Sequence, residues 1–260
     1  STGWLSVGAG VDRPGQGYLS LGTSAWISYL DDNALLDPQQ RTFNLAGIEK
    51  GLVFPIGTMQ AAGASYNWMR DQLCRAEKQT ALDQGGSIYD KINRQIAAEA
   101  PGAGGVLFLP YLTGERSPWW DANARGAFLG LDISTTHAQL LRAVMEGVAM
   151  NLSLILRVFR GKYPFESLRI LGGGAQEPLW RQVLADVLGV RVEKPNLLEE
   201  GCSLGAAMAA GIGAGVFRDA GEIRRFLRVE EVTVPDPDRS AQYAALTDRF
   251  QDAYLRLRGF

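Results

Sequence analysis

Three consecutive glycines, Gly172 to Gly174, lie between an apolar run at 167–171 and a helical pattern at 177–188. Glycine lacks a Cβ atom and tolerates positive φ, so a ligand can approach the backbone closely at such a corner. The start of the following helix offers unpaired N–H groups and a partial positive charge, which suit a nucleotide. Taken alone, the motif fits a tight strand-to-helix turn without a ligand better than it fits a binding site.

Two further segments of small residues are candidates to approach a phosphorylated ligand. In Gly22-Thr23-Ser24, a hydroxyl and backbone N–H groups suit phosphate oxygens, and a β-bulge or hairpin turn explains the segment equally well. Residues 62–65 open a helical pattern, and close packing through small residues is the simpler interpretation there. The chain lacks the G-x-x-x-x-G-K-[ST] motif, so it is not a P-loop protein.

Acidic and aromatic residues supply a second set of candidates. Glu115 and Arg116 are adjacent, which suggests an ion pair that shapes a loop. Trp119 and Trp120 fit a platform for a sugar or a packed loop anchor, and packing is favoured. Glu146 lies beside the apolar stripe of a long helical pattern, so we expect a buried, hydrogen-bonded structural carboxylate rather than a general base.

Composition narrows the classes of function. The 260 residues are 46% hydrophobic and 21% charged, which is typical of a globular protein. The net charge of −2 speaks against the basic surface that binds nucleic acids, so no nucleic-acid partner is expected. No apolar run has the length of a membrane span, so no membrane partner is expected. Cys74 and Cys202 form neither a metal pair nor a disulfide framework, and the single histidine, His137, excludes multi-histidine metal sites. We therefore predict no metal ligands, and the cysteine usage suits a cytoplasmic location.

The order of elements predicts an α/β layered architecture, because strand patterns alternate with helical ones. The segment 138–159 has the i, i+4, i+8 apolar spacing of a long helix with one buried stripe. Strands are predicted at 18–30 with a break at 22–24, and at 42–46, 52–55, 106–110, 167–171, 190–193 and 229–234. Helices are predicted at 61–73, 87–100, 138–159, 177–188, 204–216 and 241–257, after a helix end at 3–9.

One pair of segments resembles a known family. Residues 126–131, then seven residues, then 139–147 resemble the second diagnostic pattern of the FGGY carbohydrate kinases. Other segments are similar to the same family in the same order, and the similarity runs from the first residues to at least Val216. These segments are 22–24, 63–68, 108–118, 172–186 and 203–207.

The resemblance implies a two-domain fold and a role for this chain within it. Members have two actin-like, ribonuclease-H-like domains, each with a mixed sheet flanked by helices, and ATP and sugar bind in the cleft between them. Residues 1–260 would be the C-terminal nucleotide-binding domain, and the N-terminal sugar-binding domain would be absent from this chain. The implied cofactors are ATP and Mg²⁺, and the fragment alone is expected to be inactive. A homodimer is a further possibility.

The family pattern also implies site residues. Gly22 and Thr23 would face the ATP phosphates, Gly63 and Asn67 would lie by the nucleoside, and the glycine corner would line adenine and ribose. Where many members place a polar residue near the base, this chain has a proline, so that contact is in doubt. The implied ATP-binding residues are Gly22, Thr23, Gly63, Asn67, Gly172, Gly173, Gly174, Ala175 and Pro178.

The catalytic position and the substrate stay open. Counted without gaps, the catalytic aspartate of the family falls on Ser1, and serine is no general base at neutral pH. Residues 111–116 resemble xylulose kinases, which rank first, and 117–125 also resemble gluconate kinases. A catalytically inactive nucleotide-binding module is the alternative that Ser1 favours. An actin-like or chaperone-like ATPase is a third possibility, against which the 126–147 pattern speaks.

Overall fold

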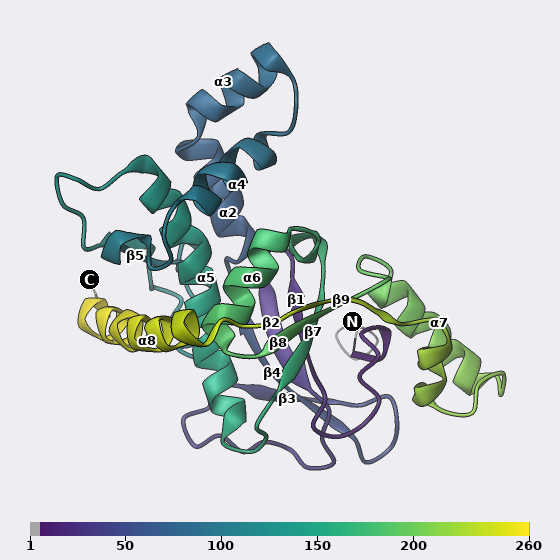
Figure 1. The fold of residues 1–260 in the computed structure, drawn as a ribbon. Coiled ribbons are helices and arrows are strands. Elements are labelled where there is room, and N and C mark those ends of the chain that lie inside the picture. Colours follow the sequence, from purple (N-terminus) through teal and green to yellow (C-terminus); the bar gives the residue numbers. More distant parts are fainter. Residues whose placement is uncertain (1–5, 260) are drawn as a thin grey trace.

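A computed structural model describes residues 6–259, which form a mixed seven-stranded sheet flanked by helices (Figure 1). The strand order is β3-β4-β2-β1-β7-β8-β9, and a small separate sheet contains β5 and β6. The strands are β1 (Gly17–Leu21), β2 (Ala25–Tyr29), β3 (Phe43–Ala46), β4 (Val53–Met59), β5 (Leu107–Leu109), β6 (Ala127–Leu129), β7 (Ser167–Leu171), β8 (Arg191–Pro195) and β9 (Val229–Thr233).

The centre of the large sheet is parallel, and this decides where the candidate site lies. Strand β1 pairs in parallel with β7, with Leu19 opposite Ile170 and Ser20 opposite Leu171. Strand β7 in turn pairs in parallel with β8, whereas β2, β4, β3 and β9 run antiparallel to their neighbours. The corner that follows β1 and the glycine corner that follows β7 are therefore brought to the same edge of the sheet.

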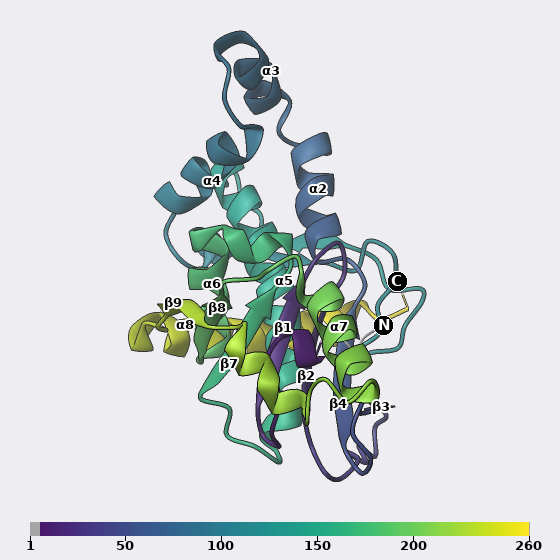
Figure 2. The same ribbon diagram turned by 90° about the vertical axis from the view of Figure 1, so that its right-hand side faces the viewer.

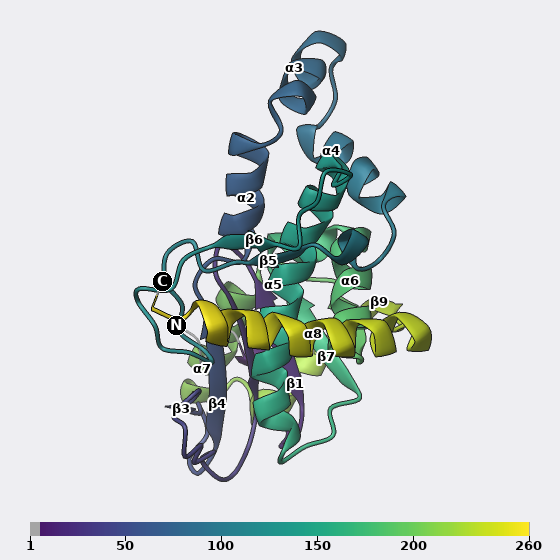
Figure 3. The ribbon, with the colours of Figure 1, turned by 90° about the vertical axis from the view of Figure 1, so that its left-hand side faces the viewer.

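Helices cover the two faces of the sheet unequally. Helices α5 and α6 pack on one face, and α8 packs outside them; α7 lies on the other side (Figures 2 and 3). Helices α2, α3 and α4 rise from one edge of the sheet, with α3 at the tip (Figure 1). The helices are α2 (Gly63–Gln72), α3 (Arg75–Gln84), α4 (Ile88–Ala98), α5 (His137–Arg160), α6 (Pro178–Leu188), α7 (Gly201–Gly213) and α8 (Pro237–Leu257); the 3₁₀ turns are η1 (Ala103–Gly105), η2 (Gly173–Gln176) and η3 (Ala220–Arg225).

Helix α5 is the core of the molecule. It begins with a capping box in which the Thr136 hydroxyl accepts from Gln139 N and the Gln139 side chain accepts from Thr136 N, and it is buried on all sides from 141 to 156. Among residues 6–259 it is the one helix long and apolar enough to cross a membrane, and most of it is buried inside the molecule, as in a core helix.

A buried polar cluster surrounds Glu146 on α5. Its Oε1 atom accepts hydrogen bonds from Arg142 Nε at 2.6 Å, Tyr243 Oη at 2.5 Å and the Gly102 amide at 3.0 Å. The Arg142 guanidinium also donates to the carbonyls of Ile96 and Glu99 at the end of α4. The predicted structural role of Glu146 is confirmed, and the cluster joins α4, α5 and α8.

The predicted order of elements is largely confirmed, and the predicted break at 22–24 is the turn of the antiparallel β1–β2 hairpin. One helix and one strand were not predicted. Helix α3 was not predicted, because it is polar all round and buries only Glu77. Strand β6 was not predicted either, since three residues are too few for a periodic pattern. Of the predicted helix end at 3–9, residues 6–8 are helical, and the rest lies outside the described residues.

Candidate functional site

A cavity of about 500 Å³ opens at the carboxyl ends of β1 and β7. Its size falls within the range of small-molecule sites. The β1–β2 turn, α2, α4, η2 and the start of α6 form its walls. The lining residues are Leu21, Gly22, Thr23, Gly63, Tyr66, Asn67, Tyr89, Asn93, Gly173, Gly174, Gln176, Glu177 and Trp180.

Two glycines allow the β1–β2 turn to pack closely against the start of α2 and the end of β7. A Cβ atom on Gly63 would stand 2.5 Å from the Gly22 carbonyl oxygen, which accepts a hydrogen bond from Gly63 N at 2.9 Å. A Cβ atom on Gly172 would stand 2.5 Å from the Leu21 oxygen, and its φ of +91° disfavours other residues. The β1–β2 turn is therefore pressed between the start of α2 and the end of β7, and the cavity has a floor of bare backbone.

The structure brings most of the predicted site residues to this cavity, and leaves three beside it. Gly172 packs against the β1 backbone beneath the floor, Ala175 is fully buried, and Pro178 is exposed at the first position of α6. Ser1, the predicted position of the catalytic residue, lies outside the described residues. The predicted residues that line the cavity are Gly22, Thr23, Gly63, Asn67, Gly173 and Gly174.

The predicted helix start with unpaired N–H groups is wrong for α6. Proline at its first position has no N–H, and the carboxylate of Glu177 accepts from Leu179 N at 3.3 Å. The amides at the start of α2 also have protein partners, because Ala62 N and Ala64 N both donate to the Thr23 carbonyl at 3.0 Å. The first amides of α2 and the Leu179 amide of α6 are therefore already hydrogen-bonded within the protein.

An aromatic wall faces the glycine floor. The rings of Tyr66 and Tyr89 are stacked with centroids 6.0 Å apart and planes at 17°, and Trp180 lies 6.0 Å from Tyr66. Arg70 donates a hydrogen bond to the Tyr89 hydroxyl, with its guanidinium 5.5 Å from the ring centroid. These three aromatic residues were not predicted as site residues, although a flat ring is the surface on which a base stacks.

A hydrogen-bonded row of polar side chains crosses the same wall. The Tyr66 hydroxyl donates to Asn93 Oδ1 at 2.7 Å, and Asn93 Nδ2 donates to Glu177 Oε2 at 2.8 Å. Burial raises the pKa of Tyr66, and the nearby Glu177 carboxylate raises it further, so Tyr66 stays a neutral donor. The carboxylate gives this end of the cavity a negative charge.

The other predicted candidates belong to a loop away from the cavity. The Glu115 carboxylate accepts from the amides of Gln60 and Arg116, both at 2.8 Å, instead of pairing with the Arg116 guanidinium as predicted. Burial raises the pKa of Glu115 to about 8. Trp119 stacks on Tyr254 with ring centroids 4.3 Å apart, which makes it a packed anchor, whereas Trp120 is half exposed.

The chain is similar to proteins of a known family. The family model described as "FGGY family of carbohydrate kinases, C-terminal domain" matches residues 17–214. A xylulose kinase of Staphylococcus epidermidis is 31% identical over 97% of this chain and 49% of its own length. A gluconokinase of Bacillus subtilis is 30% identical over 96% of this chain and 49% of its own length.

A solved structure agrees with the sequence relatives. The ligand-bound xylulose kinase of Lactobacillus acidophilus superimposes with a TM-score of 0.88 and 27% identity, covering 98% of this chain and 50% of that one. The fold is thus the actin-like ATPase fold of sugar kinases, as predicted. The chain belongs to the FGGY family of carbohydrate kinases, and it spans about half the length of the curated relatives it matches.

Proposed function

We propose that residues 1–260 supply the nucleotide-binding half of an ATP-dependent carbohydrate kinase and that ATP occupies the cavity at the carboxyl edge of the sheet. The convergence of three separate glycine corners and an aromatic wall on a single cavity of about 500 Å³ carries this proposal. A backbone floor admits a phosphate chain closely, and flat aromatic faces suit a purine. The proposed partner for activity is the N-terminal domain, which would contribute most sugar contacts.

The charges of the cavity orient the nucleotide. Glu177 and its bonded partner Asn93 make the α4–α6 end unfavourable for phosphates. Gly22 and the exposed Thr23 lie at the opposite side, with a hydroxyl and backbone as the nearest groups. We therefore place the phosphates at the β1–β2 turn, and the nucleoside between Tyr89 and the Gly173–Gly174 floor.

The residues of the cavity fit ATP, and they leave Mg²⁺ to the phosphates. Among the lining residues Glu177 is the one carboxylate, and both its oxygens already accept protein hydrogen bonds. Mg²⁺ is commonly held by substrate phosphates and water, and here it would neutralise the charge on the transferring group. The role of this chain is to bind the nucleotide, to orient its terminal phosphate toward the sugar and to exclude water when the two halves close.

For the sugar, a xylulose-type ketose ranks first. The sequence pattern at 111–116 supports it, and so do the xylulose kinases among the relatives and solved structures. Gluconate follows closely, because a gluconokinase relative has 30% identity against 31% for a xylulose kinase. A cytoplasmic location suits a sugar kinase with two free cysteines, and a homodimer is a further proposal.

A catalytically inactive nucleotide-binding module is the second candidate. It rests on Ser1, where the gap-free count expects an aspartate. The two candidates differ in one measurable way. Both bind ATP, and only the kinase transfers phosphate once the N-terminal half is present.

The test is a phosphate-transfer assay on the complete protein, this chain together with its N-terminal half. Xylulose, gluconate and glycerol are each supplied with MgATP, and sugar-dependent ADP release is followed. The proposal predicts the largest kcat/KM for xylulose. Preference for gluconate would select the alternative substrate, and ATP binding without turnover on any of the three would establish the inactive module.

A further inference from the structure

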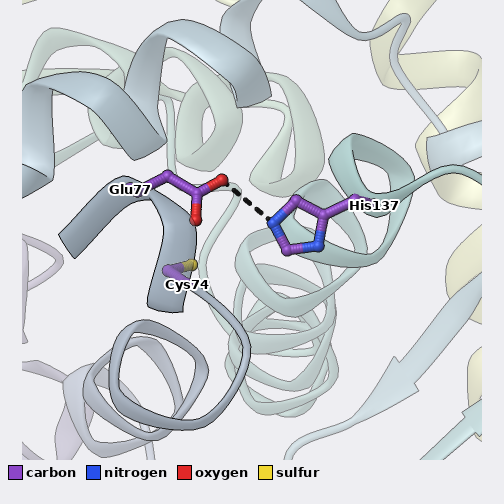
Figure 4. A group of neighbouring side chains, drawn as sticks. All are labelled: Cys74, Glu77 and His137. Atoms are coloured by element: carbon purple, nitrogen blue, oxygen red, sulfur yellow. Dashed lines mark hydrogen bonds and ion pairs between the residues drawn. The ribbon is translucent and has the colours of Figure 1, made fainter. Parts of the chain in front are cut away.

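Outside the cavity, three side chains with metal-ligating atoms meet where α3, α4 and α5 join. Cys74 is the residue before α3, Glu77 lies in the first turn of α3, and His137 is the first residue of α5. Their ligand atoms all lie within 4.8 Å of one another, and the three side chains point toward a common centre (Figure 4). Residues 60 positions apart in sequence thus contribute to one cluster.

The carboxylate in this cluster has an unused oxygen. Glu77 is 7% exposed, and its Oε1 atom accepts from Gln95 Nε2 at 2.7 Å and lies 3.2 Å from His137 Nε2. Its Oε2 atom is buried and has no hydrogen-bond partner among residues 6–259. This oxygen lies on the side of Cys74 (Figure 4). A buried acceptor without a partner is costly, and a bound cation between the three groups would satisfy it.

We propose that Cys74, Glu77 and His137 form a binding site for a divalent cation of the zinc class. Thiolate, imidazole and carboxylate together are the ligands of Zn²⁺ and Co²⁺, whereas Mg²⁺ prefers oxygen ligands alone. In a tetrahedral zinc site neighbouring ligand atoms are about 3.5 Å apart. The present spread therefore requires a closure of about 1 Å, which the exposed His137 side chain can supply by rotation.

The site has the surroundings that metal ligands need. Gln95 on α4 fixes the orientation of the Glu77 carboxylate from behind. Binding replaces the thiol proton of Cys74, which leaves to solvent, and the metal takes the thiolate electron pair. Three protein ligands leave a fourth position for water. The bound ion would tie the α3–α4 arm, which carries Tyr89 and Asn93, to the core helix α5.

The composition of the chain allows an unambiguous test. Cys74 and Cys202 are its two cysteines and His137 is its single histidine, and Cys202 is exposed and outside the cluster. In a Cys202→Ser background without a polyhistidine tag, a thiolate-to-cobalt charge-transfer band can come only from Cys74. The same titration with His137→Gln tests the imidazole, and metal-free circular dichroism shows whether each variant is folded.

We expect one Co²⁺ per chain, a charge-transfer band in the Cys202→Ser protein, displacement by stoichiometric Zn²⁺ and no displacement by millimolar Mg²⁺. His137→Gln should weaken Zn²⁺ binding more than about 100-fold, and Gln95→Leu by about tenfold. Absence of saturable binding, binding unaffected by His137→Gln, or competition by Mg²⁺ would overturn the proposal. Because the His137 side chain is exposed, the His137→Gln variant should fold, and its metal affinity decides the matter.

Discussion

The two ends of α4 lie in opposite surroundings. At its carboxyl end, the carbonyls of Ile96 and Glu99 accept from Arg142, whose guanidinium also meets Glu146 and Tyr243 in a closed polar cluster. Nearer its start, Tyr89 and Asn93 line an open cavity. One helix thus joins a cluster of hydrogen-bonded polar side chains, in which Glu146 Oε2 is the one atom without a partner among the described residues, to an open cavity in which we propose a ligand.

The closed cluster should determine the stability of the protein, whereas the cavity should determine its affinity for a ligand. In the closed cluster each group has protein partners, so removal of one leaves the others buried without compensation. In the cavity, the Tyr89 ring is 42% exposed and Gly173 has open space where a Cβ atom would stand, so both contribute little to the core. Substitutions in the first region should change the free energy of unfolding, and substitutions of Tyr89 or Gly173 should change ligand affinity.

The largest effect is expected for Arg142→Met. The variant leaves the Glu146 carboxylate buried without its cation and two α4 carbonyls without their donor. The free energy of unfolding should fall by about 3–5 kcal/mol in urea titrations. The matched control is Arg157→Met on the same helix, where an exposed ion pair with Asp248 is lost. The control should change by less than about 1 kcal/mol, and equal losses in both variants would refute the special role of the cluster.

The second prediction concerns the pH dependence of stability and rests on Glu115, a carboxylate that is buried in the loop before β6. Burial raises the pKa of Glu115 to about 8. The folded state then holds a proton that the unfolded state releases above its ordinary pKa of 4.5. Stability should therefore fall as pH rises from about 5 to about 8, by up to about 1.4 kcal/mol per pH unit, and level off above that range.

Urea titrations at pH 5 to 9 measure this slope. Glu115→Gln mimics the protonated side chain, so the contribution of this group to the slope should vanish. Glu166→Gln removes an exposed carboxylate and should leave the slope unchanged. If wild-type and Glu115→Gln proteins lose stability in parallel over this range, Glu115 is not the group responsible.

The smallest of the three effects belongs to the cavity. Tyr89→Ala removes a ring on which the base is proposed to stack, and such stacking contributes about 1–3 kcal/mol. ATP affinity should fall about tenfold, with little change in thermal stability. Leu82→Ala, an exposed residue of α3 outside the cavity, is the control and should bind ATP as the wild type does. Unchanged affinity in Tyr89→Ala would remove the aromatic wall from the proposed site.

The sequence was informative where the signal is local. Gly22, Gly63 and Gly173 at the predicted corners all line the cavity, and Gly63 marks a close approach to the Gly22 backbone. The long helix at 138–159 was readable because its apolar stripe repeats at the helical period. The fold class followed from a family pattern of fixed spacing at 126–147.

The remainder of the site depends on tertiary packing. Tyr89 and Asn93 lie in the cavity because α4 packs on α3 and α5 and its side chains reach Tyr66 of α2 and Glu177 before α6, which no local pattern encodes. Gly172 and Ala175 were assigned to the ligand, yet neighbouring residues of one turn face different ways, and these two face the protein. Similarly, Cys74 and His137 were considered separately and Glu77 was not singled out, because their juxtaposition depends on how α3 docks on α5.

Calorimetric titration of ATP into Gly173→Leu and Gly213→Leu proteins tests directly whether the nucleotide occupies this cavity. Neither glycine has an atom within 4 Å of a would-be Cβ, so both variants should fold, but Gly173 lines the cavity and Gly213 ends α7. We expect Gly173→Leu to weaken ATP binding more than about tenfold, or about 1.4 kcal/mol, and Gly213→Leu to leave it unchanged. Equal affinity in the two folded variants would contradict the placement of the nucleotide in this cavity.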